Sequence, residues 1–183
     1  MVLNFFRRRL PGRREIFAVL SFVVFVMHSW SVRGFFHEVP SFILYYKLGQ
    51  ILAIFSYMMA FALFESLMVT FGLGTLSLVM PVKWFRDGFV YKSFITVVVG
   101  AIAMLWLENT IMSLNNTFPS MGLLLGVAGI TFGIWVLLLL AFHNVKPLQK
   151  PILVFSDRIG VLAYLYIPLG ILGFVVVLVR NLW

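Results

Sequence analysis

The chain has 183 residues, of which 62% are hydrophobic and only 11% charged, and its mean hydropathy is +1.06. This composition excludes an ordinary water-soluble domain and predicts an integral membrane protein. The net charge of +8 is explained by orientation in a membrane, so no nucleic-acid partner is expected. Because cysteine is absent, disulfides, thiolate metal sites and cysteine nucleophiles are excluded.

Five long apolar runs dominate the sequence. A helix needs about 20 apolar residues to cross a hydrocarbon core of roughly 30 Å, and each run reaches about that length. Helices satisfy their own backbone groups in lipid, so we expect an all-α, polytopic integral membrane helical bundle forming a single domain over residues 1–183. The predicted spans cover about 16–32, 48–70, 93–114, 120–142 and 159–179, after a basic cytoplasmic segment at 1–15.

Lysine and arginine predict the orientation. If the N-terminus is cytoplasmic, eleven of the fourteen basic residues lie inside, as the positive-inside rule expects. The inside residues are Arg7, Arg8, Arg9, Arg13, Arg14, Lys83, Arg86, Lys92, Lys146, Lys150 and Arg158, and the outside residues are Arg33, Lys47 and Arg180. The prediction is therefore N-terminus in and C-terminus out, in a plasma (inner) membrane. Cleavage of the first span as a signal peptide stays open.

The second run is overlong, since residues 42–82 form one apolar tract of about twice the necessary length. Gly72 and Gly74 predict a break in this tract, with the remainder forming a bent or interfacial extension or a shallow re-entrant piece. A single long, tilted helix that continues to Met80 is the alternative.

Two features concern helix packing. Gly122, Gly126, Gly129 and Gly133 in the fourth run contain the small-xxx-small spacing that lets helix backbones approach closely. They predict a packing face, used either within the chain or for self-association. Pro168 in the fifth run removes one helix hydrogen bond and predicts a kink.

Two acids lie inside predicted spans, Glu65 near the inner end of its span and Glu108 near the outer end of its own. An ionised side chain at helix centre costs roughly 2.5–3.5 kcal/mol on insertion scales, which makes both candidates for function. Their separation along the membrane normal excludes a paired-carboxylate catalytic site. The sharpest candidate site is an outward-facing polar cluster of His28, Arg33, His37, Glu38, Glu108 and Asn109.

Three interpretations of this polar cluster stay open. It is a structural link between the first and third spans, a proton- or substrate-binding pocket, or a metal site, although two histidines nine residues apart fit no standard ligand spacing. We expect no metal and no cofactor.

The chain contains no catalytic motif, so no catalytic residue is predicted. The leading hypothesis is a non-enzymatic membrane subunit that packs with other membrane proteins or with itself, with anionic lipid headgroups bound at the basic cytoplasmic loops. The alternatives are a small oligomeric transporter or channel-like protein that uses Glu108 or Glu65, and a membrane enzyme that acts on lipids.

Overall fold

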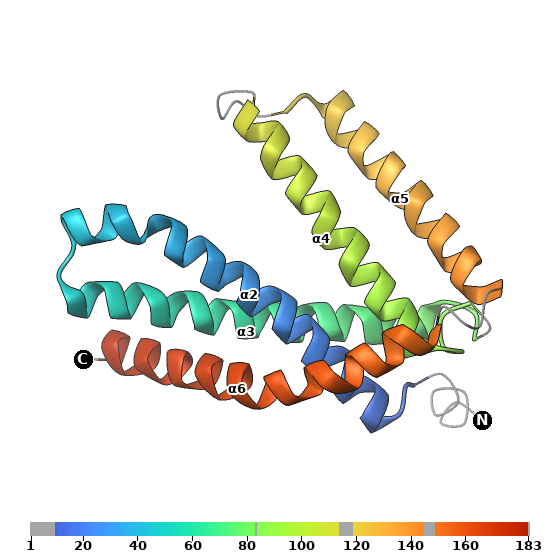
Figure 1. The fold of residues 1–183 in the computed structure, drawn as a ribbon, viewed down its shortest axis with the longest axis horizontal. Coiled ribbons are helices and arrows are strands. Elements are labelled where there is room, and N and C mark those ends of the chain that lie inside the picture. The colour runs from blue at the N-terminus through green and yellow to red at the C-terminus, as the bar shows by residue number, and fades with distance from the viewer. Residues whose placement is uncertain (1–9, 83, 114–118, 145–148, 183) are drawn as a thin grey trace. The chain divides into compact units, whose positions relative to one another are not determined.

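The structure, a computed structural model, describes residues 10–82, 84–113, 119–144 and 149–182. These residues form five helices and no strand, which confirms the all-α prediction (Figure 1). Each helix is long and apolar enough to cross a membrane. The helices are α2 (Arg13–Tyr45), α3 (Leu48–Val79), α4 (Phe89–Ser113), α5 (Met121–Asn144) and α6 (Gln149–Leu182).

The chain divides into two compact units, residues 1–87 with 154–183 and residues 88–153. The first unit contains α2, α3 and most of α6. The second contains α4, α5 and the first residues of α6. The single domain predicted over the whole chain stays a prediction, and each unit is described by itself.

In the first unit, α2 and α3 form an antiparallel hairpin connected only by Tyr46 and Lys47 (Figure 1). The buried face of α3 repeats at intervals of three and four residues, which is the spacing of a helix seam. Its members are Met59, Ala62, Ser66, Thr70, Leu73 and Ser77. The Ser66 hydroxyl donates to the Ala62 carbonyl at 2.6 Å and the Thr70 hydroxyl to the Ser66 carbonyl at 2.8 Å. These polar side chains are therefore satisfied within their own helix while remaining small enough for close packing.

The predicted break at Gly72–Gly74 is wrong, because α3 continues through both glycines to Val79. Leu73 and Ser77 are buried, so the packed face of α3 extends past the glycines. In lipid, each backbone group must also find a partner, which favours a continuous helix over an exposed turn. The long-helix alternative therefore describes α3.

α2 and α6 also extend beyond both ends of their predicted spans. α2 continues through Pro40 to Tyr45, and α6 begins at Gln149 and runs as one helix across Pro168. The ribbon of α6 changes direction near its middle, the part of the helix that contains this proline (Figure 1). The extension of α2 is held by Phe35, whose ring lies 4.9 Å from the ring of Phe55 on α3.

α6 packs on the hairpin through small side chains. Its buried residues are Ser156, Ile159, Ala163, Gly170 and Gly173. A β-carbon at Gly173 would stand 2.5 Å from the Ser56 carbonyl oxygen and 3.1 Å from the Ala60 nitrogen. α6 therefore lies directly on the backbone of α3, and only glycine fits at this point.

In the second unit, α4 and α5 share a core of Tyr91, Ile95 and Val99, against which Trp135, Leu138, Leu139, Phe142 and Ile152 pack. The indole N–H of Trp135 donates to the Thr96 hydroxyl at 2.9 Å, which links the two helices. The turn before α4 requires glycine at position 88, where φ is +80° and a β-carbon would overlap the Tyr91 ring.

Candidate functional site

His28 lies near the middle of α2 and is fully buried. Its Nδ1 is 3.0 Å from the Val24 carbonyl oxygen, and since a carbonyl only accepts, this nitrogen carries a hydrogen. Its Nε2 has no hydrogen-bond partner among the described residues. The ring lies 5.3 Å from the ring of Tyr166 on α6. His28 is thus a core residue of the first unit, placed where α2 and α6 meet.

The other predicted cluster members on α2 are exposed. His37 Nδ1 lies 3.3 Å from Glu38 Oε1, and the Arg33 guanidinium lies over the Trp30 ring at 5.6 Å from its centroid. The structure thus brings His37 and Glu38 together at the surface of α2. His28 faces the core, and no hydrogen bond or ion pair within the described ranges joins it to them.

Glu108 and Asn109 belong to α4 in the second unit, where Glu108 is half-buried and Asn109 exposed. Glu108 lies five residues before Ser113, where α4 ends. This is close to a helix end, as the sequence predicted. The association of these two residues with those of α2 stays a prediction.

Glu65 lies near the middle of α3, far from both ends of the helix. It lies 17 residues after Leu48 and 14 before Val79, or about 25 and 21 Å from the two ends of α3. A hydrocarbon layer of roughly 30 Å crossed by this helix must therefore include Glu65, wherever along α3 the layer lies. The expectation that Glu65 sits near one end of its span rested on a helix ending at residue 70, and the extension to Val79 makes its position central.

His28 and Glu65 lie at the same height on the hairpin, because each is 17 residues from the helix end at the α2–α3 connection. Their environments are opposite. His28 is enclosed by the core, whereas Glu65 is exposed and lines an open groove of about 390 Å³ between α2 and α3. The other lining residues are Ser31, Ile54, Tyr57, Met58 and Phe61. No basic side chain among the described residues forms an ion pair with Glu65.

The glycine face of α5 is open. Gly122, Gly126, Gly129 and Gly133 are all exposed, and a β-carbon at any of them would meet no atom within 4 Å among the described residues of this unit. Only 6% of the most apolar part of α5 is buried, compared with 33% for α4. Its role as a packing face therefore stays a prediction, and the close glycine packing within the first unit belongs instead to Gly170 and Gly173 of α6.

The sequence does carry a signal for the α6 contact. Ser156, Ala163 and Gly170 are spaced by seven residues, which places small side chains on one face of the helix. The α5 glycines are more closely spaced and therefore give a stronger signal of the same kind.

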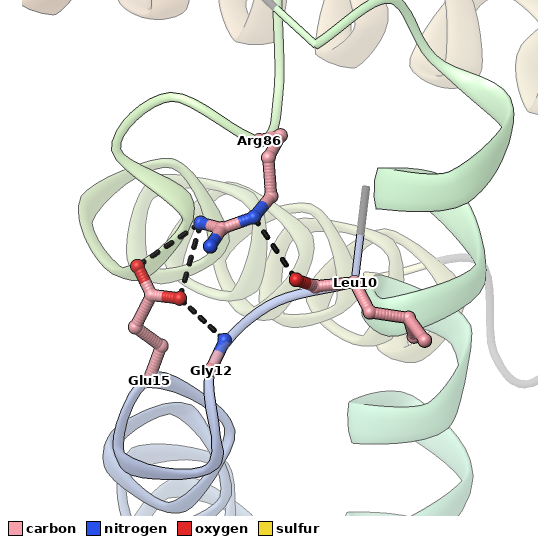
Figure 2. Close-up of polar contacts among 4 residues, drawn as sticks. All are labelled: Leu10, Gly12, Glu15 and Arg86. Atoms are coloured by element: carbon pink, nitrogen blue, oxygen red, sulfur yellow. Dashed lines mark hydrogen bonds and ion pairs between the residues drawn. The ribbon is translucent and has the colours of Figure 1, made fainter. Parts of the chain in front are cut away.

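A second feature that sequence reasoning missed is an ion pair between Glu15, in the first turn of α2, and Arg86, beyond the end of α3 (Figure 2). Arg86 Nη1 lies 3.0 and 3.1 Å from the two Glu15 oxygens, and Arg86 Nε–H donates to the Leu10 carbonyl at 3.2 Å. Glu15 also accepts a hydrogen bond of 2.6 Å from the Gly12 N–H. These contacts hold the start of α2 against the segment that follows α3.

In the part of the chain that the structure describes, no group of three or more His, Asp or Glu side chains could hold a metal ion. No protein-family model, curated protein or solved structure matches this chain.

Proposed function

We propose that this multi-pass membrane protein is a non-enzymatic subunit that packs with other membrane proteins, with its N-terminus in the cytoplasm. The observation that supports this most is α5, a strongly apolar helix whose four-glycine face is covered by no described residue of its own unit. Within the first unit, glycines make a close contact between α3 and α6. The chain thus uses glycine for close helix contact in the first unit, and the second unit presents a further glycine face.

A glycine face makes more favourable packing contacts with another helix than with lipid. Lipid tails are as apolar as leucine, so no hydrophobic force drives helices together inside a membrane. Association depends instead on dispersion and weak backbone contacts, which grow as the helix axes approach. A smooth backbone surface on α5 provides this close approach, and its exposure leaves it accessible to a second membrane protein.

Co-purification in a mild detergent tests the proposal. We expect the wild-type chain to carry a partner, and Gly126→Leu with Gly133→Leu to lose it, because leucine keeps the helix axes apart. Gly49→Leu is the matched control, since Gly49 is also exposed and a β-carbon there meets no atom within 4 Å. A wild-type chain without a partner, or a double variant that keeps it, would contradict the proposal.

A further inference from the structure

The groove beside Glu65 lies at the centre of the α2–α3 hairpin and contains an acid. We propose that it receives a lysine or arginine side chain from a transmembrane helix of the partner protein. This inference rests on the proposed function and names the chemistry of the contact. Glu65 provides the negative charge that pairs with the basic group, and the groove formed by α2 and α3 accommodates the side chain.

The position of Glu65 calls for a partner. The carboxyl lies within the hydrocarbon layer for any placement of that layer along α3, and its side chain is exposed there. An ionised acid at helix centre is costly to leave unpaired, and acids in such places pair with another group. Within the first unit, no described basic side chain forms an ion pair with it. A cation from outside the chain supplies the missing partner.

The lining of the groove suits a long basic side chain. Ile54, Met58 and Phe61 form apolar walls that match the methylene stem of lysine or arginine, whose charged end then meets Glu65. The Tyr57 hydroxyl donates to Asn181 Oδ1 at 3.1 Å, so the tyrosine is tied to α6. The groove therefore combines apolar walls with one carboxyl group, that of Glu65.

A second copy of the chain is a poor occupant. In the first unit, the described basic residue nearest to Glu65 in height is Arg33, which lies 12 residues before the end of α2. It is about 7.5 Å nearer to the α2–α3 connection than Glu65, and its guanidinium already lies over the Trp30 ring. We therefore assign the groove to a different membrane protein that carries a basic residue in the middle of a span.

The test places a photo-reactive benzoyl-phenylalanine at Phe61, which lines the groove and is 63% exposed, in the full chain in its native membrane. We expect one adduct, mapping within two helical turns of a mid-span lysine or arginine. Glu65→Gln should reduce the adduct about thirtyfold or more, as removal of one member of a buried charge pair does. Exchange of charges, with Glu65→Lys and an acid in place of the partner's basic residue, should restore it.

Several results would overturn the inference. These are an adduct far from any basic residue, an adduct to a second copy of the chain, or an adduct unaffected by Glu65→Gln. Loss of proton flux in Glu65→Gln without loss of the adduct would instead make Glu65 a transport group. The thermal unfolding of Glu65→Gln, measured in parallel, should match the wild type, since the side chain is exposed.

A second probe at Ile130, beside the α5 glycine face and 54% exposed, separates this inference from the proposed function. An adduct at Ile130 with none at Phe61 overturns the assignment of the groove and leaves the subunit proposal standing. The absence of adducts at both positions overturns both.

Discussion

Gly173 on α6 lies so close to Ser56 on α3 that a β-carbon at position 173 would stand 2.5 Å from the Ser56 carbonyl oxygen. The neighbouring contact is almost as close, because a β-carbon at Gly170 would lie 2.7 Å from Leu63 Cβ and 3.2 Å from His28 Nε2. At the height of His28, α6 therefore lies against α3 with no room for a β-carbon at either glycine.

Replacement of Gly173 by alanine should destabilise the chain. The obstacle is the backbone of α3, which cannot move aside as a flexible side chain can, so we expect a loss of about 1–3 kcal/mol. Gly160→Ala is the matched control on the same helix, where a β-carbon meets nothing within 4 Å. That change should be neutral or stabilising by up to about 1 kcal/mol, since alanine favours a helix over glycine. Unfolding in detergent measures both, and equal stability of the two variants would contradict the contact.

The ion pair between Glu15 and Arg86 should contribute about 1 kcal/mol. The two side chains are 34% and 23% exposed, so solvent screens the pair only in part, and its contribution should lie near the upper end of the range for surface pairs. A double-mutant cycle with Glu15→Gln and Arg86→Gln measures this coupling. Arg86→Lys should recover only part of it, because lysine cannot also reach the Leu10 carbonyl in the same geometry. A coupling energy of zero would show that the ion pair does not stabilise the fold.

The link between α4 and α5 should weaken when Thr96 is replaced by valine. The Thr96 hydroxyl accepts the hydrogen bond from the Trp135 indole and donates to the Lys92 carbonyl, so valine leaves the indole N–H unpaired. We expect a loss of about 1–3 kcal/mol. Thr110→Val is the control, since the exposed Thr110 hydroxyl bonds only the Trp106 carbonyl of its own helix turn. Similar losses in both variants would exclude the interhelical bond as the cause.

The orientation can be tested directly because the chain has no cysteine. Single cysteines at Lys47 and Ser120 should react with an impermeant maleimide added to intact cells. Cysteines at Asp87 and Lys150 should react only after the membrane is opened. All four positions are exposed. The reverse pattern would place the N-terminus outside and contradict the positive-inside argument.

The sequence was sufficient to predict the number of helices, because the length of an apolar run is a direct consequence of membrane thickness. It was less informative about where helices end. Phe35 packs on Phe55 beyond the predicted limit of the first span, and Leu73 and Ser77 keep α3 helical past its two glycines. The Phe35–Phe55 contact joins two helices, and tertiary packing of this kind overrides local turn preference.

The candidate site was harder to predict for the same reason. Glu65 was identified as an intramembrane acid, but its central position depends on the true end of α3 at Val79. His28 was grouped with Arg33 and His37, although it faces the core while they are exposed. Arg86 and Glu15 are 71 residues apart, and no local pattern indicates that they meet.

A packing subunit of a membrane assembly should leave the native membrane together with its partner. Extraction in lipid nanodiscs followed by native mass spectrometry measures the mass of the released particle. We expect a particle heavier than the 20.9 kDa chain that also contains a second membrane protein. A uniform population at 20.9 kDa, with lipid but no other protein, would contradict it.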